Sequence, residues 1–396
     1  MTLKDLKEGS VLIYKKFEEI GINDIHQLMM NSVQEGKTIE YKLMLPGGND
    51  QERKEFLADV SSFANTMGGD LIYGIEEENG IPKKIVGVEL SDVDAEIRRL
   101  DNMIRDGIEP RIITNIKSIA TEDSKMILLL RIPKSWNSPH RVIFKRHDKF
   151  YARNSGGKYS LDTSELRLAF TSSYVIEEKI RKFRNERVHT LMFNETPIPL
   201  EPGPKIILHV IPIDALSRNS NYDIFRPNMN SILRPIRATG WNSRINFEGL
   251  VLFTGNGSPS YSYVQLYRNG IIEAVNISIL SSNSVKKYIP SLAYEEALIE
   301  SLNNYLEALR EMEVTIPLFC FLSFAGIKGY RLGLSSSWQD SYDIEKENLL
   351  LPETIIDNYD LKAETILKPS FDLVWNACGL QRSFNYDKNG NWSPRH

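Results

Sequence analysis

A chain of 396 residues is too long for one average domain, so its length predicts two. The net charge of −4 excludes a protein that is basic over its whole surface, and a site for a polyanion must therefore be a local patch. The two cysteines, Cys320 and Cys378, lie far apart and do not support a disulfide framework or a cysteine zinc site. No apolar run approaches the roughly 18 residues of a membrane helix. We expect a cytoplasmic protein without a membrane segment.

The first part of the chain predicts short helices before residue 30 and a strand over 37–42. Apolar residues at three- and four-residue spacing predict a helix over 51–67, which Gly68-Gly69 would end. A strand over 71–76 and a returning strand over 84–88 flank a tight turn at Asn79-Gly80. A second helix is expected over 92–104, with Ser91 as its cap.

Further strands are expected over 111–119 and 126–132, followed by a hairpin of 142–144 and 150–153 around His147-Asp148. Asp162 with Glu165 three residues later resembles a capping box, which predicts a helix running toward Tyr174. This order of elements predicts an α+β domain over residues 1–173.

Residues 174–204 are expected to be a charged helical connector followed by a proline-rich linker. The connector's basic residues are balanced by glutamates and predict a solvated helix face; they are Lys179, Arg181, Lys182, Arg184 and Arg187. A separate mixed α/β domain is expected over 205–396. It would contain a β-meander over 249–254, 260–268 and 271–277, and a long helix after Ser291.

Three acidic residues stand at or near strand ends, where distant positions can converge: Glu35, Glu40 and Glu76. Convergent carboxylates can hold Mg²⁺ or Mn²⁺ against phosphate oxygens, and such a metal can generate a hydroxide at neutral pH. Lys42 shares a strand face with Glu40 and could stabilise charge developing on a phosphate. The alternative is a solvated Glu–Lys pair on an exposed strand face, which contributes little.

Four short sequence motifs, in this order along the chain, then suggest a family. They are Glu35-x4-Glu40-Tyr41-Lys42, Phe63-Ala64-Asn65-Thr66-Met67-Gly68-Gly69, Gly74-Ile75-Glu76, and Ile85-Val86-Gly87-Val88. Together they resemble the AlbA_2 domain, also called the Schlafen AlbA-like domain. Each motif alone is weak, but their order makes the resemblance fairly specific. It covers most of residues 25–170, and it implies a mixed α/β fold for that part of the chain.

The resemblance implies two functional branches. Many bacterial members are regarded as DNA-binding or ATP-binding regulators. Schlafen-type members include endoribonucleases that cleave tRNA or rRNA with two glutamates and one aspartate in a metal site. Glu35 and Glu40 fall on the two glutamate positions. Glu76 is the candidate third ligand, where the nucleases carry Asp, and Asp70 and Glu78 are its rivals. Schlafen cores also pair two AlbA-like lobes around a basic valley. We find one lobe here, so a homodimer is expected.

The segment from Arg131 to Lys158 contains eight basic residues and one acid, Asp148. Aromatic residues are interleaved with them, and aromatic rings offer stacking surfaces for unpaired bases, while basic residues neutralise phosphates. The predicted nucleic-acid contacts are Arg141, Lys145, Arg146, Lys149, Arg153 and Lys158. The alternative is a solvated hairpin whose aromatic rings belong to the core.

Three hypotheses follow. The first is a nucleic-acid-binding protein, specifically a divalent-metal endoribonuclease that acts on structured RNA such as tRNA, with RNA favoured over DNA. Analogy to family members adds a role in antiphage defence. In this hypothesis Glu35, Glu40 and Glu76 bind the metal and Lys42 stabilises charge. The second is a non-catalytic DNA-binding transcriptional regulator. The third is a structural oligomer without nuclease activity.

Overall fold

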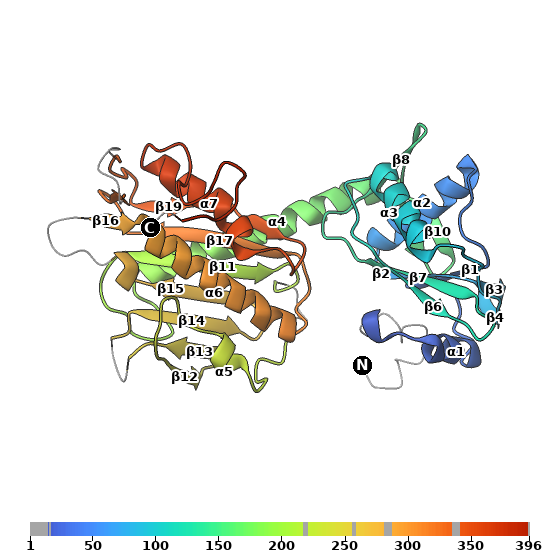
Figure 1. Ribbon diagram of the computed structural model, residues 1–396, viewed down its shortest axis with the longest axis horizontal. Helices are drawn as coiled ribbons and strands as arrows, with labels where there is room; N and C mark the ends of the chain where they lie inside the picture. Colours follow the sequence, from blue (N-terminus) through green and yellow to red (C-terminus); the bar gives the residue numbers. More distant parts are fainter. Residues whose placement is uncertain are drawn as a thin grey trace. The chain divides into compact units, whose positions relative to one another are not determined.

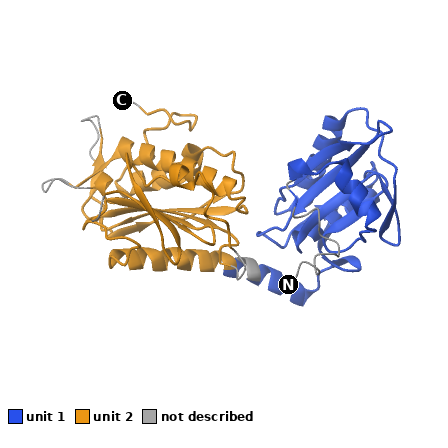
Figure 2. Ribbon diagram, turned by 90° about the horizontal axis from the view of Figure 1, so that it is seen from below, with its two compact units in different colours: residues 1–175 blue, residues 176–396 orange. Residues whose placement is uncertain are grey.

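The structure is a computed structural model that describes residue 15 and residues 17–216, 221–255, 259–280, 287–334 and 341–394, the side chains of residues 172 and 173 excepted. The chain divides into two compact units, residues 1–175 and 176–396, and the boundary falls inside the helix α4 (Thr163–Met192) (Figure 2). Helices and several sheets occur together, which confirms the predicted α+β class. No helix in the described ranges is both long and apolar enough to cross a membrane.

Unit 1 is built on a four-stranded sheet in the order β1 (Ile39–Lys42), β2 (Gly68–Tyr73), β7 (Met126–Pro133) and β6 (Asn115–Ala120). β1 and β2 are parallel, and the other pairs are antiparallel. α1 (Ile22–Met30) covers one face, and α2 (Asp50–Ala64) and α3 (Val93–Gly107) cover the other (Figure 1). A short 3-10 helix, Phe17–Glu19, precedes α1. Because both faces are covered, every residue of β2 is buried.

A second sheet carries the basic segment in the order β10 (Gly157–Ser160), β9 (His147–Asn154), β8 (Arg141–Phe144) and β5 (Ile108–Glu109), and it packs on α2. Asn65 fixes this contact. Its side-chain amide donates to the backbone oxygens of His140 (3.0 Å) and Tyr151 (2.8 Å), and its Oδ1 accepts from the His140 N–H at 2.6 Å. The asparagine of the Phe63-Ala64-Asn65 motif therefore joins the end of α2 to β9 and to the residue that precedes β8.

The helix ends differ from the predictions. α2 ends at Ala64, and its C-cap Asn65 is right-handed, so the expectation that Gly68-Gly69 ends this helix is wrong. Gly68 begins β2 with a left-handed φ of 74°. Gly69 is needed for close packing, since a Cβ there would lie 2.5 Å from the Phe63 ring. At α3 the cap is Asp92, which accepts from the Ala95 N–H at 2.8 Å, and not Ser91.

The strand expected over 71–76 is divided in two. β2 ends at Tyr73, and Gly74 follows with φ of 93°, a conformation that glycine adopts without the steric cost of a Cβ. β3 (Ile75–Glu78) then leaves the sheet and pairs with β4 (Ile81–Ile85). The predicted turn at Asn79-Gly80 is confirmed by φ values of 55° and 75°. Glu76 therefore lies on a separate hairpin and not at the end of a strand of the main sheet.

Unit 2 contains an eight-stranded sheet. Its order is β12 (Asn242–Ile245), β13 (Gly249–Phe253), β14 (Ser262–Tyr267), β15 (Ile272–Asn276), β11 (Lys205–Pro212), β17 (Leu318–Ala325) and β19 (Asn348–Leu350), and β20 (Thr354–Ile356) also pairs with β17. β16 (Tyr288–Pro290) and β18 (Arg331–Gly333) form a separate parallel pair. β13, β14 and β15 confirm the predicted β-meander.

Helices cover both faces of this sheet. The predicted long helix is α6 (Ser291–Glu311), and it shares the larger core with α7 (Ala363–Ala377) and the short α5 (Met229–Ile232). A 3-10 turn, Ser278–Leu280, follows β15. The second half of α4 covers the opposite face through Val188 and Leu191. Cys320 and Cys378 are buried free thiols, as their apolar surroundings predict.

The prediction of a solvated basic face on the connector is wrong for Arg184 and Arg187 of α4, whereas Arg181 is partly exposed. Arg181 pairs with Glu353, and Arg184 is buried and donates to the Leu351 carbonyl at 3.0 Å. Arg187 makes two hydrogen bonds of 2.8 Å to the fully buried carboxylate of Glu273. These cations attach α4 to the sheet of unit 2, and a helical charge pattern alone does not distinguish such contacts from a solvated face.

Candidate nucleic-acid interface

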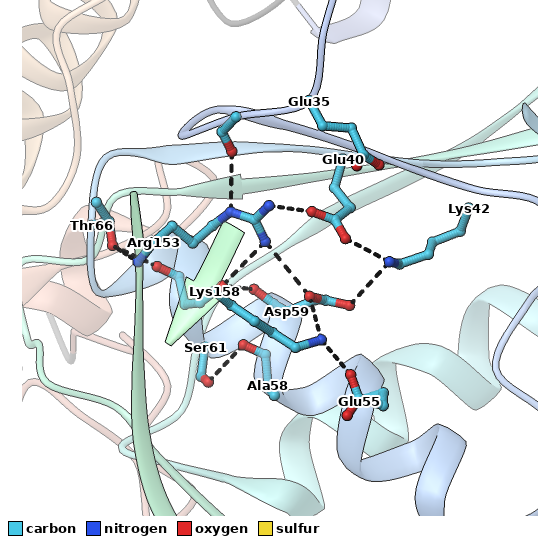
Figure 3. A network of polar contacts seen from close by, with 12 residues as sticks. Glu35, Glu40, Lys42, Glu55, Ala58, Asp59, Ser61, Thr66, Arg153 and Lys158 are labelled. Carbon is cyan, nitrogen blue, oxygen red and sulfur yellow. Dashed lines mark hydrogen bonds and ion pairs between the residues drawn. The ribbon is translucent and has the colours of Figure 1, made fainter. Parts of the chain in front are cut away.

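Arg153 of β9 lies at the centre of a charged cluster in unit 1 (Figure 3). Its guanidinium pairs with the Glu40 carboxylate of β1 and lies 3.6 Å from Asp59 Oδ1 of α2. The ring centroid of Phe63 is 4.1 Å below the guanidinium carbon, a cation–π geometry. Arg153 is only 3% exposed, so its charge faces the protein interior and does not reach a ligand on the surface.

Two lysines complete the cluster. Lys158 of β10 lies 2.8 Å from Asp59 Oδ1 and 2.5 Å from Glu55 Oε2. Lys42 of β1 lies 2.5 Å from Glu40 Oε1 and 4.0 Å from Asp59 Oδ2. Three carboxylates are thus matched by three cations, listed here as Glu40, Glu55 and Asp59 against Lys42, Arg153 and Lys158. This balance joins β1, α2, β9 and β10 electrostatically.

Burial and charge act in opposite directions on these groups. Burial disfavours ionisation of Glu40, but the positive charges of Arg153 and Lys42 outweigh it and hold the pKa of its carboxyl below the ordinary value. Burial raises the pKa of Asp59, against the charges of Lys158 and Lys42. Burial would lower the pKa of Lys42, but the charges of Asp59 and Glu40 raise it. The cluster therefore keeps Glu40 and Lys42 ionised at neutral pH.

Glu35 lies beside this cluster but has a different environment. Its Oε1 accepts a hydrogen bond of 2.8 Å from the Tyr41 N–H, and burial raises the pKa of its carboxyl. The negative charges of Glu40 and Glu77 raise it further. On the β3–β4 hairpin it is therefore Glu77, and not the predicted Glu76, whose charge acts on Glu35. Glu76 is exposed and lies opposite Lys84 in the hairpin.

Of the three predicted metal ligands, Glu35 and Glu40 lie near enough for their charges to interact, but Glu76 does not join them in one group. Within the described ranges, no group of three or more His, Cys, Asp or Glu side chains is placed to hold a metal ion. One oxygen of Glu40 pairs with Lys42 and the other with Arg153, so each already faces a cation. The residues as placed do not form a ligand set of three carboxylates for Mg²⁺ or Mn²⁺, so the metal site remains a prediction.

The two rival third acids have other partners. Asp70 is buried and accepts two hydrogen bonds from Arg131, of 2.8 and 2.9 Å. This bidentate geometry links β2 to β7 and is typical of a structural ion pair. Glu78 is exposed and lies 3.5 Å from Lys83 on the same hairpin. Both acids therefore pair with a cation, and within the described ranges neither forms a group of three metal-binding side chains with Glu35 and Glu40.

The six predicted nucleic-acid contacts fall into three groups. Arg153 and Lys158 belong to the charged cluster. Arg141 pairs with Glu109 at 2.9 Å and Lys145 with Asp50 at 2.6 Å, both in exposed positions where an ion pair contributes little. Arg146 and Lys149 are exposed, and among the described residues neither has an ion-pair partner. Of the six predicted contacts, the exposed cations without an ion-pair partner in the described ranges are therefore Arg146 and Lys149, at and near the end of the β8–β9 hairpin.

The turn of this hairpin is not the predicted one. His147 pairs with Phe144 in the ladder, so the two turn residues are Lys145 and Arg146 and not His147-Asp148. Their φ values are 46° and 63°. A two-residue hairpin turn with both residues left-handed favours Asn-Gly, because side chains with a Cβ are disfavoured there. Two long cations occupy these strained positions, which places both charges at the exposed tip.

The sequence reading missed Asp59, Glu55 and Glu77. Asp59 lies on α2 with Glu55 one turn before it, and Asp59 is 1% exposed. A carboxylate within an otherwise apolar helix segment could have indicated a charged cluster, since a buried charge requires partners of opposite charge. Glu77 gave no such signal, because its position depends on a register shift that falls between Glu76 and Glu77 where β3 pairs with β4.

Comparisons with known proteins agree with the resemblance for the first unit. Residues 35–162 match the family model described as Schlafen, AlbA_2, so this part of the chain is a Schlafen AlbA_2 domain. Among curated proteins, none matches the chain.

Two solved structures show partial similarity. The DIP2311 protein from Corynebacterium diphtheriae is 21% identical over 37% of this chain and 27% of its own, with a TM-score of 0.26. The N-terminal domain of a RecG-related protein from Nitrosomonas europaea is 24% identical over 27% of this chain and 71% of its own, with a TM-score of 0.22. This chain thus spans about a quarter of the length of the first of them.

Proposed function

We propose that the Schlafen AlbA_2 domain of this chain binds nucleic acid, RNA in preference to DNA, through the tip of the β8–β9 hairpin. The family match supports nucleic acid as the type of ligand. The contacting element follows from the placement of charge, because Arg153 and Lys158 are neutralised by carboxylates while Arg146 and Lys149 are exposed and unpaired among the described residues.

The tip has the features of a phosphate-binding element. Lys145 and Arg146 occupy consecutive left-handed positions, so the turn is short and both side chains start from its outermost point. The pairing of Lys145 with Asp50 is exposed and is readily exchanged for a phosphate. Basic side chains that neutralise phosphates release condensed counterions, which provides most of the affinity in sequence-independent binding. The strained turn is the observation that carries the proposal, since backbone strain persists where function requires it.

The first experiment measures affinity by fluorescence anisotropy with a labelled RNA stem-loop at low salt. The variant is Arg146→Ala with Lys149→Ala. The matched control is Lys83→Ala with Lys84→Ala on β4, which removes the same charge from exposed positions of the same domain. We expect the tip variant to bind roughly tenfold more weakly or worse, and the control to lose much less. Equal losses would mean that only net charge matters and would contradict the assignment of the tip.

Cleavage of RNA is a separate proposal with its own support. Glu35 and Glu40 are close enough for the charge of each to act on the other, and Lys42 lies beside Glu40. Purified protein with Mn²⁺ and labelled tRNA should then give discrete fragments that are lost in Glu35→Gln and Glu40→Gln. Because Glu40 also pairs with buried Arg153, Glu35→Gln is the cleaner variant. Binding without cleavage by the wild type would favour the regulator and would contradict the nuclease.

A homodimer is the remaining part of this proposal. One AlbA_2 lobe per chain, against two in a Schlafen core, supports it. Light scattering at working concentrations should give twice the chain mass of 45.4 kDa. A monomeric mass would contradict it. A role in antiphage defence is proposed only together with RNA cleavage.

A further inference from the structure

A cavity of about 300 Å³ lies between α2 and α3, beside the β8–β9 hairpin. Its apolar wall consists of Leu57 from α2, Met103 from α3 and Phe144, the last residue of β8. Phe144 directly precedes the turn residues Lys145 and Arg146. The volume is at the lower end of the ~300–1,000 Å³ found for small-ligand sites. The cavity is therefore large enough for one small planar ligand and adjoins the proposed phosphate-binding tip.

The polar wall of the cavity comes from α3. Asn102 and Asp106 are four residues apart on this helix and so lie on one face of it. An asparagine amide can donate to and accept from a base edge, whereas a carboxylate only accepts, and it therefore pairs with an exocyclic amino group. Asp106 Oδ1 accepts from Arg105 Nε at 3.0 Å, and its second oxygen remains an acceptor. A lining that combines an aromatic ring with an amide and a carboxylate is chemistry suited to a nucleobase.

Two arginines at the cavity supply positive charge. Arg99 is fixed in place by Glu96 and by the Pro46 carbonyl, to which it donates at 2.7 Å. Arg53 is different: its Nε is buried and has no hydrogen-bond partner among the described residues. A buried donor without an acceptor is destabilising and is usually satisfied by a ligand, ion or water. Because Arg53 lines the cavity, a small rotation of its side chain would turn this donor toward a phosphate oxygen bound there.

We infer that this cavity receives one unpaired nucleotide of the bound strand, with its base against Phe144 and its phosphate at Arg53. The base is one with an exocyclic amino group, because Asp106 accepts and does not donate. A base inside a duplex is stacked on both sides and cannot enter, so the substrate class is single-stranded or bulged nucleic acid. The inference rests on the proposed function and adds that the bound nucleic acid contains an unpaired nucleotide.

The test compares two RNA probes that differ only in one bulged 2-aminopurine, whose amino group matches Asp106. Wild type should bind the bulged probe roughly tenfold more tightly than the fully paired one, a typical contribution of one stacked base. Phe144→Leu, which keeps an apolar side chain, and Asn102→Trp, which fills the cavity from an exposed helix position, should remove this preference. Both should leave the affinity for the paired probe unchanged. Arg98→Ala, at an exposed position of α3 that does not line the cavity, is the control and should keep the preference.

The outcomes separate the two proposals. Equal affinity of wild type for both probes, or a preference that survives in both cavity variants, would overturn the inference and leave the proposed function intact. If the tip variant Arg146→Ala with Lys149→Ala binds both probes as tightly as the wild type, that result would contradict the proposed function instead. Unchanged thermal unfolding of each variant shows that a lost preference reflects the cavity and not the fold.

Discussion

The guanidinium of Arg153 pairs with the carboxylate of Glu40 across 113 residues of sequence, joining β9 to β1 inside unit 1. This pair removes from the surface two residues that the sequence predicts to act there, one as a nucleic-acid contact and one as a metal ligand. Among the predicted nucleic-acid contacts, the exposed cations without an ion-pair partner in the described ranges are Arg146 and Lys149.

Arg153 is expected to stabilise the fold and to contribute little to nucleic-acid contact. Arg153→Met should lower the free energy of unfolding by about 3–5 kcal/mol, because it leaves Glu40 and Asp59 buried without their shared cation. Denaturant titration followed by circular dichroism measures this. Glu40→Gln should also destabilise, since it leaves Arg153 unpaired. An Arg153→Met protein as stable as the wild type would show that the cluster is solvated and not buried.

The turn residue Arg146 should show opposite effects on stability and on binding. Arg146→Gly relieves the left-handed backbone and should raise the free energy of unfolding by ~1 kcal/mol, while RNA affinity falls with the lost charge. Arg146→Ala loses the same charge and keeps the strain, so it isolates the backbone effect. If the glycine and alanine variants have equal stability, the turn is not strained.

Glu295 should make the stability of unit 2 depend on pH. This carboxylate is fully buried and accepts from Trp375 Nε1 at 2.7 Å and from Asn385 Nδ2 at 2.9 Å, with no cation beside it in the described ranges. Burial raises its pKa to about 7, against the hydrogen bonds that favour the charged form. Because the folded pKa lies above the ordinary 4.5, the stabilisation is complete below pH 4.5 and is lost as pH rises to about 7.

The predicted loss is about 3 kcal/mol between these limits, at about 1.4 kcal/mol per pKa unit. Unfolding followed by the fluorescence of the tryptophans, among them Trp375 beside Glu295, gives the stability at each pH. Glu295→Gln cannot ionise, and it should flatten the curve in this window. A wild-type curve that rises from pH 4.5 to 7, or an equal slope in the variant, would contradict a protonated Glu295.

Much of the local structure of the candidate site follows from the sequence. Alternation in Ile39–Lys42 predicts that Glu40 and Lys42 share a strand face, and both are half-buried there between fully buried Ile39 and Tyr41. The Asn79-Gly80 turn is likewise confirmed, because its two residues are those that tolerate left-handed backbone. The sequence predicts these features correctly because each depends on the backbone preferences of a few adjacent residues.

Other parts of the site depend on tertiary contacts that no local pattern encodes. Gly74 reads as an ordinary strand glycine, yet its left-handed φ turns Glu76 away from the main sheet. Lys145-Arg146 carries no turn signal, because both residues are poor at left-handed positions. Whether a basic residue of β9 faces solvent or the interior is decided by Asp59 and Glu40, which come from other elements. α7 was also not expected, and it contains Pro369 within its length, which normally interrupts a helix.

The most direct test of the hairpin tip is the salt dependence of RNA binding. The logarithm of the association constant is measured against the logarithm of salt concentration for wild type, for Arg146→Ala with Lys149→Ala, and for Lys83→Ala with Lys84→Ala. Each lost phosphate contact lowers the slope by roughly 0.7–0.9. The tip variant should therefore show a slope smaller by about 1.4–1.8, and the β4 control should match the wild type. A tip variant with the wild-type slope would show that Arg146 and Lys149 do not contact phosphate.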